Sequence, residues 1–473
     1  SISRPIAPER VAHSWLRCVP FFVLLLVGWP ATSLAQDTEP TSPTPQTAGS
    51  EATDGSPDRI ARQLALSVEP QPVIEVAAAD GFFTASVPAK LAGPVRSHEP
   101  VYQLDLQFGP SPEMLLTCFV YRQGVDLGSL LLLYTEQHTQ AVAAHHGGVS
   151  GRTLHAVDAG HFEASPWIGL NWFVHMPDRG SGASTVQAKF WVAMVDERTV
   201  YCGSTMVFGY DDSVFAVFRS LVETITFADD PLRDVQVYYE ALSLVRIGEN
   251  PVGFARELHY FDASGNLFND RHSTLVLPVD PAHVTSIDSL FTDRADLDGR
   301  LIARTYLRSE NGDGQTHLQL GRGADGTWTV RGSLQGKPLE TPVGPADLFS
   351  ELGVRVALRG YLEIAEPETY MSYSDWNPEL DPTTFVTVHL AFDGRDGDRW
   401  RLIDGQPTTL TMTFDRTLSE RSLAIDLGQA MMTYAPVWST GNVLYPSTRR
   451  ANLEATTASA SPGAETPDDP RPR

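Results

Sequence analysis

A glycine-rich hexapeptide is the first segment whose residue types could do chemistry. Residues Gly321 to Gly326 (GRGADG) fit the G-x-G-x-x-G pattern of dinucleotide-binding loops. Such a loop holds a pyrophosphate only where a helix follows it, because the helix N-terminus supplies the amide donors. Here Thr327 to Arg331 (TWTVR) follows, which reads as a strand. We therefore predict a hairpin turn and no nucleotide cofactor.

Two other segments carry metal-binding residue types. Asp293 to Gly299 (DRADLDG) is similar to half of a calcium loop, but the full loop ends in a Glu about six residues after the Gly, and Thr305 stands there. His138 and His145 are two helical turns apart, whereas zinc-binding helices place two histidines at i and i+4. We predict a solvated turn and helix-end histidines, and no metal.

The cysteines favour a disulfide over a nucleophile. Cys118 and Cys202 lie in strand-like runs, and an even pair in an oxidising compartment favours a bridge. Two buried free thiols are the alternative, because the sequence gives no separation between their Cα atoms. Both have mainly apolar neighbours, whereas a reactive thiol needs a positively charged setting. With no G-x-S-x-G turn in the chain, we predict no catalytic residue.

The N-terminus predicts export. Three arginines between residues 4 and 17 precede an apolar run, Phe21 to Val27, and Ser33-Leu34-Ala35 places small residues before a cleavage point at Gln36. The run is far shorter than the roughly 20 apolar residues that span a bilayer. We expect residues 1–35 to be a cleaved signal peptide and the mature chain to be periplasmic or secreted, with no transmembrane span.

Composition limits the partners and divides the chain. A net charge of −23 repels phosphates and anionic headgroups, so nucleic acid is excluded as a partner. Residues 36–68 and 452–473 are poor in large apolar side chains and rich in Pro, Thr and Ser, which predicts a disordered linker and tail. The turn Ala228 to Pro231 separates an α+β block, 69–230, from a mainly β block, 231–451.

The first block mixes strands and helices. Alternating runs predict an antiparallel sheet, Ser129 to Ala144 reads as a helix with Asp126 or Ser129 as N-cap, and a second helix begins at Asp211 or Asp212. Gly81-Phe82 to Pro88 and the closing pattern of Ser220, Ile225 and Phe227 resemble the small exported α+β domains of the PsbP and DcrB kind. Those families have no shared catalytic set to carry over.

The second block reads as nearly all strand. Asp-Gly and Asn-containing turns recur between alternating runs, and only Pro345 to Gly360 reads as a helix. This predicts a large twisted sandwich or a half-barrel. Tyr238 to Arg256 (YYEALSLVRIGENPVGFAR) is similar to the opening of an exported β domain found alone or before bacterial transglutaminase-like domains. No cysteine follows residue 202, so that catalytic domain and its chemistry are absent here.

A ligand groove is the expected site. One helix cannot cover the inner face of so large a sheet, so we expect an apolar groove between helix and strands, lined by Leu348, Phe349, Leu352, Val356, Leu318, Leu320, Trp328 and Val330. We predict a non-enzymatic exported module that binds an apolar ligand or an envelope protein. A hydrolase with dispersed acidic residues and a structural envelope protein are the alternatives. Two carboxylates in one pocket would favour the enzyme.

Overall fold

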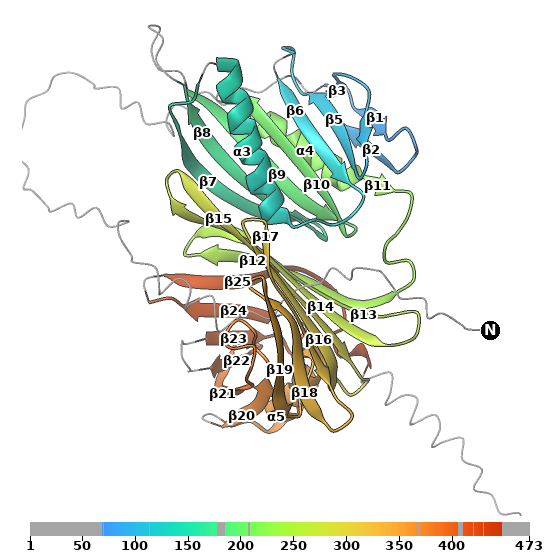
Figure 1. The fold of residues 1–473 in the computed structure, drawn as a ribbon, viewed down its shortest axis with the longest axis vertical. Coiled ribbons are helices and arrows are strands. Elements are labelled where there is room, and N and C mark those ends of the chain that lie inside the picture. Colours follow the sequence, from blue (N-terminus) through green and yellow to red (C-terminus); the bar gives the residue numbers. More distant parts are fainter. Residues whose placement is uncertain are drawn as a thin grey trace, which may run out of the picture.

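The computed structural model describes residues 69, 71–112, 114–146, 148–176, 185–206, 209–366, 369–404, 410–419, 421–428 and 430–446 (Figure 1). The predicted signal peptide, linker and tail lie outside these residues. The described residues form an N-terminal region, 69–227, and a C-terminal region, 236–446.

The N-terminal region is built on two antiparallel sheets. Its strands are β1 (Ile74–Ala77), β2 (Phe83–Val87), β3 (Lys90–Leu91), β4 (Arg96–His98), β5 (Val101–Gln107), β6 (Leu115–Tyr121), β7 (Gly151–Phe162), β8 (Ser165–His175), β9 (Thr185–Val195), β10 (Arg198–Met206) and β11 (Thr226–Phe227). A three-stranded sheet has the order β1-β2-β11. An eight-stranded sheet has the order β3-β5-β6-β10-β9-β8-β7, with β4 paired to β5. The predicted antiparallel α+β class is confirmed.

Two helices cover opposite faces of the larger sheet. They are α3 (Leu127–His146) and α4 (Asp211–Thr224). Side chains alternate across a strand, so the neighbours Phe190 and Trp191 of β9 pack into the separate clusters under α3 and α4. Asp126 caps α3, since its Oδ1 accepts a hydrogen bond from the Ser129 amide at 3.0 Å.

The predicted disulfide is confirmed. Cys118 on β6 and Cys202 on β10 are directly opposite each other, their Cα atoms are 4.1 Å apart, and the bridge is fully buried. A disulfide fits an oxidising compartment. No helix among the described residues is both long and apolar enough to cross a membrane.

The C-terminal region is one antiparallel sheet of 14 strands. They are β12 (Gln236–Ile247), β13 (Asn250–Phe261), β14 (Leu267–Asp280), β15 (His283–Ala295), β16 (Leu301–Glu310), β17 (Asp313–Arg322), β18 (Thr327–Leu334), β19 (Lys337–Pro345), β20 (Tyr370–Asp375), β21 (Val386–Asp396), β22 (Arg399–Asp404), β23 (Leu410–Phe414), β24 (Arg421–Asp426) and β25 (Met431–Gly441). Neighbours in sequence pair throughout, except that β12 joins β25 and leaves β19 and β20 as the edges.

This sheet curls around a single helix, α5 (Glu351–Ile364), as the half-barrel alternative predicted (Figure 1). Trp328 on β18 and Leu402 on β22 are far apart along the sheet, yet both pack in one core with Leu358 of α5. We call the face toward α5 the inner face. The outer face of β13, β14 and β15 packs against α3, β7 and β8 of the N-terminal region.

The predicted bounds of the helix, Pro345 to Gly360, are wrong. Residues through Pro345 pair with β18 as part of β19, and the helix begins only where the Ser350 side chain accepts a hydrogen bond from the Gly353 amide. The helix therefore begins six residues later than the apolar pattern indicated, at Glu351, and continues to Ile364.

Both short motifs form turns, as predicted. Gly323 to Gly326 connects β17 with β18, and the Gly326 amide donates to the Gly323 carbonyl at 3.0 Å. Asp296 closes the other turn, because its Oδ1 accepts from the amides of Asp298 and Arg300 at 2.9 Å.

Candidate functional site: the cavity between the two regions

The residues predicted to line a groove lie mostly in packed core. Leu318, Leu320, Trp328, Val330 and Leu348 are buried in one cluster on the inner face. Phe349 is half-buried and bridges to Arg300, and Leu352 packs in a separate cluster with Tyr238 and Tyr239. Val356 is 37% exposed and faces away from the sheet.

Charged residues explain why the apolar pattern misplaced this helical face. The buried face of α5 is formed by residues at helical spacing: Glu351, Arg355, Leu358 and Leu362. The first two, Glu351 and Arg355, form an ion pair, so the face toward the sheet begins with charged side chains. The space between α5 and strands β20 to β24 measures about 80 Å³, and none of the eight predicted residues lines it. Ligand sites usually measure about 300 Å³ or more.

The ion pair of α5 belongs to a buried charged network on the inner face. Arg355 donates to Glu351 at 3.0 Å and to both oxygens of Glu257 at 2.7 and 2.9 Å. Glu351 also accepts from Arg271 at 3.1 Å and from Arg421 at 2.9 Å. Each carboxylate is therefore held by at least one guanidinium, which is the condition under which buried charge is tolerated.

The network continues along β15 and β16. Asp293 accepts from Arg271 at 2.9 Å and from Arg304 at 2.6 Å, and Arg304 also donates to Asp375 at 2.6 Å. In all, four guanidinium groups meet four carboxylates, so the formal charges balance: Arg271, Arg304, Arg355 and Arg421 with Glu257, Asp293, Glu351 and Asp375.

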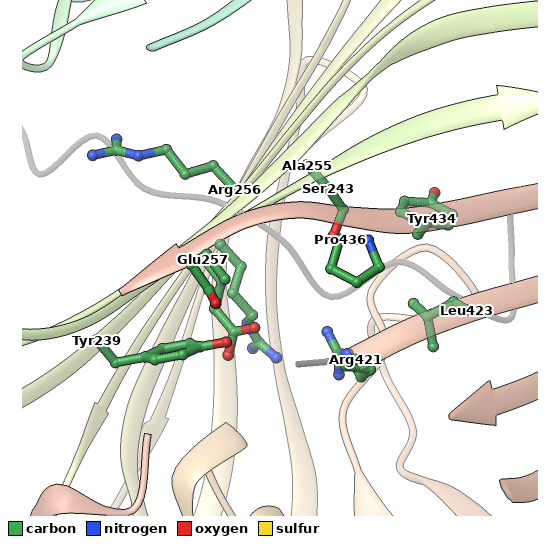
Figure 2. A pocket seen from close by; sticks show the side chains of 12 residues that line it. Tyr239, Ser243, Ala255, Arg256, Glu257, Arg421, Leu423, Tyr434 and Pro436 are labelled. Atoms are coloured by element: carbon green, nitrogen blue, oxygen red, sulfur yellow. The ribbon is translucent and has the colours of Figure 1, made fainter. Parts of the chain in front are cut away.

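The hollow beside this network is too small for a ligand. Figure 2 shows Tyr239, Glu257 and Arg421 converging there, while Arg256 extends from the opposite face of its strand. The hollow measures about 40 Å³, which is room for a water molecule. We interpret the network as structural.

The cavity that best fits a ligand lies between the two regions, on the outer face of the large sheet. It measures about 310 Å³ and its surface is mainly apolar. One wall comes from the start of α3 and the turn between β9 and β10, and the other from β14 to β17. It is lined by Gly124, Val125, Asp126, Leu127, Met194, Glu197, Thr199, His272, Asp288, Leu290, Leu307, Arg308, Ser309, Gly314, Thr316 and His317.

Two carboxyl groups, one from each region, meet in this wall. Asp288 is 3% exposed, and its Oδ1 accepts from Thr274 Oγ1 at 2.7 Å and from the Gly128 amide at 3.4 Å. Asp126 accepts from the Ser309 hydroxyl as well as from the Ser129 amide. Both carboxyls thus lie at the N-terminus of α3, where the helix dipole favours negative charge.

Burial, the charge of Asp126 and a hydrogen bond with Asp126 raise the pKa of Asp288 well above its ordinary value. Desolvation penalises the ionised carboxyl, and a second carboxylate beside it adds repulsion. The physical result is a pair that shares one proton, with Asp288 donating to Asp126.

A histidine extends this pair along β14. The Thr274 hydroxyl donates its one hydrogen to Asp288, so its oxygen must accept the hydrogen bond from His272 Nε2–H, at 2.7 Å. The His272 ring packs edge-on against Phe254. This chain of hydrogen bonds holds Asp288 rigidly in the wall.

Replacing Asp288 by Asn should remove a pH dependence of stability. Above about pH 4 the folded protein keeps a proton on Asp288 that the unfolded chain has released. The free energy of unfolding of the wild type therefore falls by about 1.4 kcal/mol per pH unit from this group, until the raised pKa is passed. Asn does not titrate, so the difference between variant and wild type should increase with pH.

Urea unfolding at about pH 5, 6 and 7 measures that difference. Asp398→Asn, at an exposed carboxylate of the turn between β21 and β22, is the matched control and should show a constant difference. A constant difference for Asp288→Asn as well would contradict the shared proton.

A larger hollow, of about 670 Å³, is less suited to a ligand. It lies at the surface beside Pro446, and turn residues such as Asp262, Gly265 and Leu297 form most of its rim. Of its lining residues only Phe261 and Pro446 are buried, so it offers little apolar wall for a ligand to contact.

The prediction of a helix-end histidine is wrong for His138, which lies in the middle of α3 and is held there by packing. His138 on α3 hydrogen bonds to Thr205 and packs edge-on against Phe190, and burial lowers its pKa to about 4. Among the described residues, no group of three or more His, Cys, Asp or Glu side chains is arranged so that it could hold a metal ion.

Sequence reasoning identified Asp126 only as a helix cap and did not single out Asp288 or His272. The sequence signal that could have indicated these residues is the presence of polar side chains inside long strand runs, as in His272-Ser273-Thr274 and Ser286 to Ser289. Such residues must be hydrogen-bonded wherever both sheet faces are covered.

The fold and the cavity define a mostly β, two-region protein with a candidate ligand site at its internal interface. No family model matches the chain, and no curated protein matches it. A solved structure of a beta-barrel-like protein of the domain of unknown function DUF1849 from Brucella abortus is similar at 12% identity and a TM-score of 0.34. That similarity covers 43% of this chain and 97% of the other.

Proposed function

We propose that this protein is a non-enzymatic binding module of the cell envelope that holds a small, mainly apolar ligand in the cavity between its two regions. The cavity carries this proposal: it has ligand size, a mainly apolar surface, and polar lining side chains from both regions. The predicted signal peptide supports export, and the buried disulfide agrees with an oxidising compartment.

A hydrolase is the second candidate, because two carboxyl groups that share a proton can act as acid and base. Against it, Asp126 and Asp288 already accept hydrogen bonds from the amides and hydroxyls that hold α3 on the sheet. Turnover of a bound ester or amide that Asp288→Asn abolishes would establish the hydrolase instead.

Filling the cavity should weaken ligand binding. N-phenyl-1-naphthylamine, an uncharged dye that fluoresces in apolar surroundings, should bind at one site per chain. Leu290 is 4% exposed and lines the cavity, so Leu290→Trp should weaken dye binding at least about tenfold, or about 1.4 kcal/mol. Leu307→Trp, at a half-buried lining position, tests the same cavity with less disturbance of the core.

Leu297→Trp is the matched control. Leu297 is 48% exposed and borders the surface hollow beside Pro446 rather than the cavity. Dye binding that Leu297→Trp abolishes and both cavity variants retain would move the site to that hollow. A wild type that shows no saturable fluorescence would overturn the proposed function altogether.

A further inference from the structure

We infer that the ligand of this cavity carries a protonated amino group, which takes the place of the proton shared by Asp126 and Asp288. This inference rests on the proposed function and names the class of ligand: an apolar body with one cationic amine. It follows from the charges around the cavity and from one buried oxygen atom.

Two lining residues of the N-terminal region, Asp126 and Glu197, are acidic, and none of its lining residues is Lys or Arg. Arg256 lies beside the cavity and pairs with Glu197, a lining residue, and with Glu240 at 2.6 Å. One guanidinium therefore faces two carboxylates, which leaves an excess of negative charge on this side.

In the opposite wall, the guanidinium of Arg308 is already partnered by carboxylates that lie outside the lining. Arg308 lines the cavity and lies 3.5 Å from Glu379 and 3.7 Å from Glu310. Of the residues that line the cavity, Asp126, Glu197 and Asp288 are carboxylic acids, Arg308 carries the one guanidinium, and His272 and His317 are the remaining titratable side chains. In a partly desolvated cavity this field favours a cation and disfavours an anion.

One oxygen of Asp288 is the place for that cation. Asp288 Oδ2 is buried and receives no N–H or O–H donor from the described residues. Within the pair, a shared proton offsets its repulsion from Asp126, in addition to the hydrogen bonds that Thr274 and Gly128 donate to Asp288 Oδ1. An ammonium group brings both a positive charge and three N–H donors, so it satisfies the oxygen and permits both carboxylates to ionise.

Ligand binding exchanges one proton for one ammonium group, so the charge of the site does not change. The empty site holds one proton and the occupied site holds the ammonium, so binding releases one proton to solvent and forms no covalent bond. Amine affinity should therefore rise with pH, by up to about tenfold per unit, as long as the pair is protonated in the empty site. An uncharged ligand of the same length should show no such rise.

Three probes of equal chain length test the inference: octylamine, octanol and octanoate, each in competition with the naphthylamine dye. At about pH 7 we expect octylamine to bind at least about tenfold more tightly than octanol, with octanoate weakest. Calorimetry in two buffers of different ionisation enthalpy should report close to one proton released for octylamine. Asp288→Asn should reduce the ratio of amine to alcohol affinity to about one, whereas Asp398→Asn should keep it.

The outcomes separate the two proposals. If neither dye nor octanol binds, the proposed function fails. If both bind and octylamine has no advantage, or if its advantage persists in Asp288→Asn, only the amine inference is overturned. Asp126→Asn should reduce the same ratio and provides a second measurement if Asp288→Asn does not fold.

Discussion

Replacing Arg355 by Met should lower the free energy of unfolding by about 3 to 5 kcal/mol. Arg355 is fully buried, and its guanidinium holds Glu351, both oxygens of Glu257 and the carbonyl of Leu418, the last at 2.6 Å. Met fills most of the volume but supplies no donor. Glu257 would then keep its charge in the core with His259 as the remaining hydrogen-bond donor that contacts it.

Arg359→Met is the matched control, one turn further along the same helix. Arg359 is exposed and pairs only loosely with Glu363, at 3.6 Å, so its loss should change stability by no more than about 0.5 kcal/mol. Urea unfolding of both variants measures the difference. Equal effects would contradict the view that the network stabilises the half-barrel.

The same contacts make acid stability depend on Arg355. Burial alone would raise the pKa of Glu257, but the charge of Arg355 and the hydrogen bond from His259 lower it to about 2. A lowered pKa contributes stability that is present above the unfolded value, about 4.5, and lost as pH falls toward 2. Arg355→Met should therefore flatten the loss of stability in this range.

Removing the disulfide should cost about 4.5 kcal/mol of unfolding free energy. Cys118 and Cys202 are 84 residues apart, and closing a loop of this length restricts the unfolded chain by about that amount in the chain-entropy model. The double variant Cys118→Ala, Cys202→Ala isolates the effect. Because the bridge is fully buried, the folded wild type should resist dithiothreitol, and reduction should follow unfolding.

Urea unfolding with and without reductant provides the control. Reductant should shift the midpoint of the wild type toward that of the double variant and leave the double variant unchanged. A wild type whose midpoint does not respond to reductant, although its thiols become free, would show that the cross-link adds little stability.

Local patterns in the sequence determined much of the fold. Alternating runs predicted the antiparallel sheet of the N-terminal region, and Asp126 marked the start of α3, because these signals depend on neighbours a few residues apart. The strand β7 gives no such signal. It is half-exposed over most of its length and lacks a clear alternation, so nothing local distinguishes it from a loop.

The sequence by itself also predicted the disulfide, the hairpin turns and a mostly β C-terminal region with one helix. Those follow from residue type and spacing. Only the tertiary structure decided which residues face a cavity. The apolar pattern put Val356 toward the sheet, but the buried contacts of Glu351 and Arg355 rotate that face, and these depend on partners in β13, β14 and β24.

The candidate site could not be predicted from local sequence patterns either, because its residues are also brought together by contacts between distant parts of the chain. Asp126 and Asp288 belong to different regions, and neither has a pattern that names the other. They meet because the outer face of β14 and β15 packs on the start of α3, and that packing is set by apolar residues of both regions, such as Leu131 and Val276. Periodicity fixes which face of a strand a side chain occupies, whereas burial, and with it the raised pKa of Asp288, depends on what covers that face.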